Sequence, residues 1–154
     1  MRRLQLILAL TLLLSALARA NHVLVVADHK PTRREIAKLI DQLTTKDASD
    51  AANKLLSFGL DGVPMIIERL DDRRPIGTNS IGYFANIMPE GFESVAHYSP
   101  KQVVDCLHTI LSLITEANVK CGLDSGGTDA QRVACIERWR AWGKAHPIPT
   151  SKPQ

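Results

Sequence analysis

Two tryptophans, a cysteine and several arginines are concentrated in one short stretch, RVACIERWRAWGKAH, residues 132–146. Cys135, Trp139 and Trp142 are spaced at i, i+4 and i+7, so they would share one face of a helix. Tryptophan and arginine carry much of the binding energy at interfaces, but a tryptophan stripe on an amphipathic terminal helix is typical of a core. We therefore interpret Trp139 and Trp142 as structural core residues rather than as a ligand box.

The other reactive side chains form no known catalytic or metal-binding pattern. None of the five histidines has metal-ligand spacing: His22, His29, His97, His108 and His146. A cysteine nucleophile would be Cys106 or Cys135, but both fall on expected helix faces. We predict no catalytic residue, no cofactor and no metal. The alternative is an enzyme that uses His97 with a cysteine or an acidic residue.

The three cysteines allow one disulfide and one remaining thiol. Cys106 lies within an apolar helix face, which favours pairing of the other two. Our hypothesis is a disulfide between Cys121 and Cys135, although spacing alone does not decide it. Such a bond is expected in an oxidising compartment.

The first twenty residues have the pattern of a cleaved signal peptide. Arg2 and Arg3 precede an apolar run, and the segment ends with the small-x-small sequence Ala18-Arg19-Ala20. The run is shorter than the roughly 20 residues of a membrane-spanning helix. We predict that residues 1–20 are removed, that the mature chain begins at Asn21, and that it is periplasmic or secreted. An uncleaved anchor is the alternative.

Charge excludes one class of partner. The chain has 19 Lys and Arg against 16 Asp and Glu, but three of the bases (Arg2, Arg3 and Arg19) belong to the signal segment, which contains no acid. The mature chain therefore has 16 of each and no basic excess, which argues against a nucleic-acid partner. We also expect no membrane partner after cleavage.

The first half of the mature chain has the periodicity of three helices. A capping box, Thr32-x-x-Glu35, precedes the first apolar face, and Pro64 begins the third helix. Asp47 is an expected cap and Gly59 an expected end for the second. The apolar pattern of the first helix returns 27 residues later in the third, which indicates an internal repeat.

Two further helices are expected in the second half. The longest would follow a capping box at Ser99–Gln102, and the tryptophan helix a third box, Thr128-x-x-Gln131. The proline-rich end, residues 147–154, is expected to be a flexible tail. In all we predict at least five helices and no sheet beyond a short N-terminal extended piece.

Residues 72–98 interrupt the helical rhythm with glycines, prolines and most of the remaining aromatic residues. A loop of this length within a compact domain is uncommon and often functional. Aromatic and arginine side chains are enriched at interfaces. Our hypothesis is a protein-binding surface formed by Arg73, Arg74, Tyr83, Phe84, Phe92, His97 and Tyr98. The alternative is a loop that packs over the core.

The segments LIDQL…DASDAANKLLSFGLDGVPMIIERLDD and VVDCLHTILSLIT…GGTDAQRVACIERWRAWGKAH resemble HEAT-type repeats in short bacterial proteins. The resemblance covers about residues 32–146, apart from the insertion. It implies an all-α fold, a compact stack of antiparallel helix pairs with about two repeats and a long aromatic inserted loop. Residues 21–146 would form this single domain. Stacks of this type mostly bind other proteins and share no catalytic residues.

We therefore expect a non-enzymatic, exported module that binds another protein. Its size and compartment suit an inhibitor or immunity protein for an exported toxin. The alternatives are the periplasmic enzyme described above and an accessory protein of envelope assembly.

Overall fold

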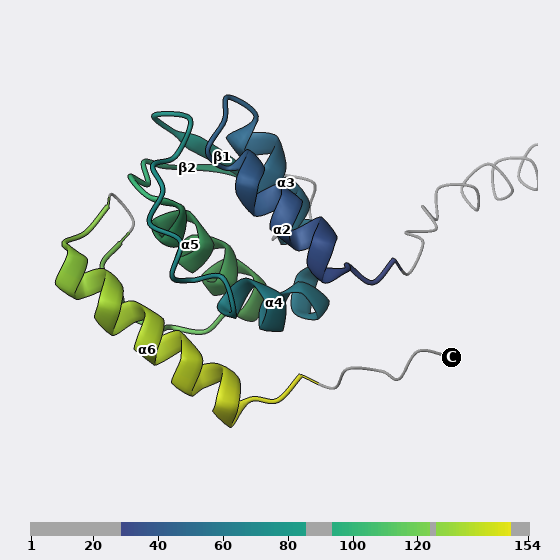
Figure 1. Cartoon of the computed structure of the whole chain (residues 1–154), viewed down its shortest axis with the longest axis vertical. Helices are drawn as coiled ribbons and strands as arrows, with labels where there is room; N and C mark the ends of the chain where they lie inside the picture. Colours follow the sequence, from purple (N-terminus) through teal and green to yellow (C-terminus); the bar gives the residue numbers. More distant parts are fainter. Residues whose placement is uncertain (1–28, 86–93, 124–125, 149–154) are drawn as a thin grey trace, which may run out of the picture.

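The computed structural model describes residues 29–85, 94–123 and 126–148, and these residues form a mostly helical domain with a small two-stranded antiparallel sheet (Figure 1). The predicted helices are confirmed, with five α-helices in the described part. The predicted absence of a sheet is wrong. The signal segment, Asn21 and residues 149–154 lie outside the described residues. Within the described ranges, no helix has the length and apolar character needed to cross a membrane.

Four short elements form the first half: α2 (Arg33–Gln42), α3 (Ala48–Ser57), the 3₁₀ helix η2 (Gly59–Gly62) and α4 (Val63–Ile67). Thr32 caps α2 as predicted, because its Oγ1 accepts from the Glu35 N–H at 3.1 Å. Asp47 stands at the predicted N-cap position of α3, although its side chain makes no cap bond. Gly59 adopts a positive φ of 54°, which suits its place at the end of α3.

The sheet is a hairpin of β1 (Ile81–Ala85) and β2 (Ser94–Tyr98), with Ile81 opposite Tyr98. Ile81 and Tyr83 are fully buried, as expected for the alternate residues of a half-buried strand. The hairpin packs on α3, where Asn53 Nδ2 donates to the Gly82 carbonyl at 2.8 Å. The insertion is therefore partly strand that covers the core.

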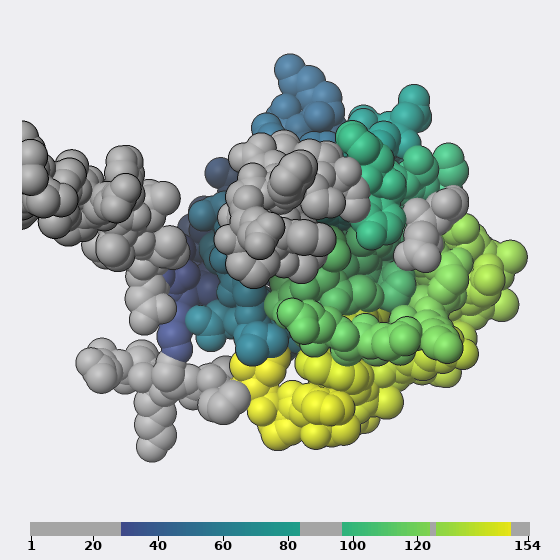
Figure 2. Space-filling model, turned by 180° about the vertical axis from the view of Figure 1, so that it is seen from behind, coloured from purple at the N-terminus to yellow at the C-terminus, as the bar shows by residue number. Residues whose placement is uncertain are grey.

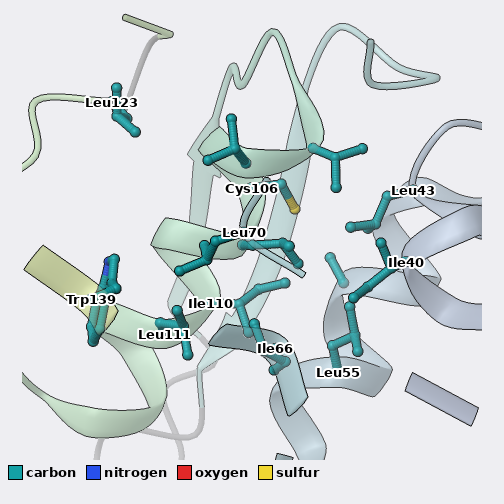
Figure 3. Close-up of a cluster of buried hydrophobic side chains, with 14 of the residues drawn as sticks. Ile40, Leu43, Leu55, Ile66, Leu70, Cys106, Ile110, Leu111, Leu123 and Trp139 are labelled. Carbon is teal, nitrogen blue, oxygen red and sulfur yellow. The ribbon is translucent and has the colours of Figure 1, made fainter. Parts of the chain in front are cut away.

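α5 (Val103–Thr115) is the central helix, in contact with α3, α4 and α6. All nine residues from 103 to 111 are buried, and Ile110 lies in the middle of the apolar cluster of Figure 3. The helix begins three residues later than a capping box at Ser99 would place it. The carboxylate of Asp105 provides the cap instead, because its Oδ2 accepts from the Gln102 N–H at 3.0 Å.

α6 (Asp129–Ala145) lies along α5 and α4. Its predicted capping box is confirmed, since the Gln131 N–H donates to Thr128 Oγ1 and the Thr128 N–H to Gln131 Oε1. The predicted disulfide between Cys121 and Cys135 is also confirmed and joins the α5–α6 loop to α6. Figure 2 shows this loop, in green, lying directly against the yellow helix.

A buried ion pair connects α5 to α6. Arg132 Nε donates to Asp105 Oδ1 at 2.8 Å, and Arg132 Nη2 donates to Asp105 Oδ2 at 3.0 Å. The Asp105 side chain is 0% exposed and that of Arg132 is 7% exposed. The bond to Asp105 raises the pKa of the Arg132 guanidinium. Neither charge can be left alone at this position without a large desolvation penalty.

We expect Asp105→Asn to lower the free energy of unfolding by about 3–5 kcal/mol, because the Arg132 charge would remain buried and would keep only the exposed carboxylate of Asp129, 3.1 Å from its Nη1. Urea denaturation followed by circular dichroism measures this loss. The control is Arg33→Ala, which removes an exposed pair with Glu68 and should change the free energy by less than about 1 kcal/mol. Equal effects of the two substitutions would contradict the structural role of Asp105.

The two tryptophans should differ in their contribution to stability. Trp139 is 0% exposed, whereas Trp142 is only half-buried. Trp139→Ala should cost about 3–5 kcal/mol of unfolding free energy. Trp142→Ala should cost about 1–2 kcal/mol, because less of its surface leaves water on folding. The same denaturation experiment measures both, and a larger loss for Trp142 would reverse the assignment.

Candidate functional site

A groove of about 330 Å³ lies between α4 and the C-terminal part of α6. Its walls are mainly apolar and include Val63, Pro64 and Ile67 on one side and Trp142 on the other, with Ile148 beyond the helix end. Figure 2 shows the yellow C-terminal end of α6 next to the dark teal segment that contains α4. The volume is in the range of sites that bind a small ligand or a few side chains. We call this site the α4–α6 groove.

Gly143 allows the two helices to approach closely at the groove. A Cβ at this position would stand 3.0 Å from Ile67 Cδ1, closer than most side-chain contacts. Glycine inside a helix is less favourable than alanine by roughly 0.5–1 kcal/mol. This cost is offset here by the close packing of α4 on α6.

The Trp142 ring is held between two other rings. It makes an edge contact with Trp139, with 5.6 Å between ring centroids, and stacks on His146 at 4.6 Å. His146 also lies within hydrogen-bonding distance of the Trp142 carbonyl, 2.9 Å from its Nδ1. The indole is thus fixed in one orientation while part of its surface remains open to the groove. Of the two tryptophans expected in the core, only Trp139 is fully buried.

The rim of the groove is mostly basic. Arg140, Lys144 and His146 line it together with one acid, Glu68. Glu68 is paired with Arg33, and Arg140 with Asp71. Lys144 makes no ion pair with any other residue that the structure describes. Its exposed ammonium group can therefore meet an anionic ligand without breaking an existing pair.

The surface predicted for residues 72–98 is divided in the structure. Tyr83 is 0% exposed, and its hydroxyl lies 3.2 Å from Cys106 Sγ. Tyr98 is half-buried against Tyr83, with an edge contact of 5.3 Å between centroids. These two tyrosines pack over the core, as in the alternative interpretation. The side chains of Phe84 and Phe92 lie outside the described part of the structure.

The polar members of that predicted surface lie nearer to solvent. Arg74 binds both oxygens of Asp72 and also Asp41 Oδ1, at 2.8 Å. Arg73 is 3.7 Å from Asp129. His97 is exposed on β2. The structure thus separates these three residues from the buried Tyr83.

The cysteines are poorly suited to nucleophilic catalysis. Cys106 is buried, and its burial raises the pKa of the thiol to about 12, although the hydrogen bond with Tyr83 opposes this shift. Cys135 is held in the disulfide. A thiol of such high pKa is almost entirely protonated at neutral pH, and only the thiolate is a good nucleophile.

A second group of reactive atoms is buried where α5, α6 and their connecting loop meet. One ligand atom each of His108, Cys121 and Cys135 lies within 4.8 Å of the other two. His108 Nδ1 accepts a hydrogen bond from Trp139 Nε1 at 3.0 Å. Spacing in the sequence did not reveal this group, because its members come from three elements.

The groove was missed for a similar reason. Trp142 falls on the same helical stripe as Trp139, and periodicity cannot show which of the two tryptophans the neighbouring elements cover completely. Ile67 and Gly143 give no individual signal in the sequence. A glycine one residue after a tryptophan in a helix is the only local hint of a close approach.

We expect Cys106 to be unreactive toward iodoacetamide in the native chain at pH 8. With a pKa of about 12, on the order of one thiol in ten thousand is ionised. Mass spectrometry should find Cys106 alkylated only after denaturation. Tyr83→Phe should react no faster, because the hydrogen bond with Tyr83 lowers this pKa. Rapid alkylation of the native chain would restore Cys106 as a candidate nucleophile.

Comparison with known proteins identifies no relative. The chain matches no protein-family model, and no curated protein or solved structure is significantly similar to it.

Proposed function

We propose that this protein is a non-enzymatic, exported binding module, and that the α4–α6 groove holds an acidic segment of another protein that carries an apolar anchor residue. The observation that carries the proposal is a mainly apolar groove with a partly exposed tryptophan and a basic rim. Tryptophan and arginine are the side chains most often found at the energetic centre of protein interfaces.

The apolar part of the groove favours an apolar side chain of the partner. Trp142 and Ile67 are both half-buried, so their free surfaces remain in contact with water until a ligand covers them. Covering apolar surface gains about 25 cal/mol per Å². Because Trp142 is already fixed by its ring contacts, little side-chain entropy is lost on binding.

The charge of the rim favours an acidic neighbour to that anchor. Lys144 is exposed and His146 lies beside it, while the single acid of the rim is engaged by Arg33. Opposite charge around an apolar centre increases the association rate and selects the partner. The mature chain has no predicted net charge, so this preference is local to the groove.

The predicted compartment supports the wider role that we propose. A disulfide is typical of oxidising environments and agrees with a predicted periplasmic or secreted location. An inhibitor or immunity protein for an exported toxin is the specific role that we propose. The relation to HEAT-type repeats remains a hypothesis for residues 32–146.

The first test uses anilinonaphthalene sulfonate, an apolar anion that matches the chemistry of the groove. We expect one dye to bind per chain, with energy transfer from tryptophan. Trp142→Ala should weaken binding at least tenfold, and Lys144→Glu several-fold, since they remove the apolar wall and a rim charge. The matched controls are Val133→Ala, an exposed apolar residue on the same helix, and Lys38→Glu on α2. Equal binding by all four variants would exclude the groove.

The second test selects displayed peptides on the full chain. We expect acidic peptides with an aromatic or aliphatic residue, which displace the dye and bind Trp142→Ala at least tenfold more weakly. Peptides that lose affinity for Arg74→Ala but not for Trp142→Ala would place the interface at residues 72–98 and overturn the groove. If fatty acids displace the dye and no peptide is selected, the ligand is a small amphiphile and the protein-binding proposal fails.

A deletion of residues 149–154 tests whether the chain's own end occupies the groove. Tighter dye binding by this deletion variant would identify that end as the occupant and would contradict the proposal.

A further inference from the structure

We propose that His108, Cys121 and Cys135 form a zinc site when the disulfide is reduced. Their ligand atoms already lie within 4.8 Å of one another. In a tetrahedral zinc site with Zn–S bonds of about 2.3 Å, two sulfurs stand about 3.8 Å apart. The three side chains are therefore close to the arrangement that one ion requires, and two thiolates with one imidazole are a ligand set typical of Zn²⁺.

The elements that carry the ligands can reach this geometry. His108 lies in the middle of α5 and Cys135 in α6, and these helices are fixed by the Asp105–Arg132 pair. Cys121 lies in the connecting loop, next to Gly122 with its positive φ of 69°. Two ligands are thus preorganised on helices, and the third can move by a small adjustment of the loop.

An ion and a reductant both have access to the cluster. A cavity of about 320 Å³ is lined by His108, Ser112, Cys121 and the loop residues 117–120. Cys121 is 7% exposed and Cys135 is 0% exposed, so an attacking thiolate would reach the sulfur of Cys121. The cavity also leaves room for a water molecule as the fourth ligand, an arrangement that occurs in zinc sites with three protein ligands.

The chemistry consists of two balanced steps. A dithiol reductant transfers two electrons and two protons, so that the Cys121–Cys135 bond breaks, two thiols form and the reductant becomes a disulfide. Zn²⁺ then replaces the two thiol protons, which pass to the solvent. Exchange with a disulfide oxidant would form the Cys121–Cys135 bond again, reduce the oxidant to a dithiol with two protons from the solvent, and release the metal.

Zinc binding should also change the environment of Trp139. A neutral imidazole has one nitrogen lone pair, and in the structure the lone pair of His108 Nδ1 accepts from Trp139 Nε1 at 3.0 Å. A nitrogen lone pair that binds the metal cannot accept this bond as well. Zinc binding and the Trp139 hydrogen bond are therefore in competition, which provides a fluorescence signal.

The test titrates Zn²⁺ into the full chain after reduction with dithiothreitol and removal of the reductant without oxygen. A chromophoric chelator reports the free metal. We expect one equivalent to bind the reduced chain and none to bind the oxidised chain at this site. Cys121→Ser and His108→Gln should weaken binding at least tenfold. Glutamine can still accept from Trp139, so the second variant removes the ligand with little change in packing.

Cys106→Ser is the matched control, because Cys106 is buried elsewhere and should leave zinc affinity unchanged. In a Trp142→Phe background, zinc should shift the emission of Trp139. If reduction unfolds the chain, return of the helical circular dichroism on addition of zinc supports the site, and failure to refold contradicts it. Equal binding by the oxidised chain or by His108→Gln, loss of binding in Cys106→Ser, or no binding at all would also overturn the proposal.

Discussion

The buried pair of Asp105 and Arg132 is the interaction on which the rest of the domain depends. Asp105 caps α5 through the backbone N–H groups of residues 101 and 102, and it also binds two nitrogens of Arg132 on α6. One carboxylate thus fixes where the central helix begins and where the last helix lies. Because both side chains are almost completely out of water, either one alone would be strongly unfavourable, and the two helices must be placed together.

Both candidate sites follow from this placement of α6. The helix contributes Cys135 to the buried cluster, Trp139 as the hydrogen-bond donor to His108 of that cluster, and Trp142 to the groove about one turn further along. Trp139 is fully buried and donates to His108 of α5, whereas Trp142 is half-buried and lines the groove opposite Ile67 of α4. Gly143 then brings Ile67 close enough to form the opposite wall. The disulfide adds a covalent connection in the N-terminal half of the same helix.

Local signals in the sequence were enough to predict the helices, but they could not predict which residues make contacts between the helices. The boxes at Thr32 and Thr128 predict helix starts because capping is decided within four residues. The disulfide between Cys121 and Cys135 could be predicted because Cys106 lies on an apolar helix face, which leaves the other two cysteines to pair. The pair of Asp105 and Arg132 spans 27 residues, and no periodic pattern predicts it. In the sequence alone, Asp105 is only a polar residue within an apolar helix. The hairpin was missed because glycine and proline dominate its surroundings, although Ile81 and Tyr83 alternate as in a strand. Periodicity likewise places Trp142 in the core, because it cannot report how completely the neighbouring elements cover each side chain.

A double-mutant cycle between Asp105 and Arg132 measures this dependence most directly. The free energy of unfolding would be determined by urea denaturation for the original chain, Asp105→Asn, Arg132→Met and the double variant. If the pair holds α5 and α6 together, removing both partners should cost much less than the sum of the single losses, with a coupling free energy of at least about 2 kcal/mol. A coupling below about 0.5 kcal/mol would show that the two residues act independently and would contradict the role assigned to them.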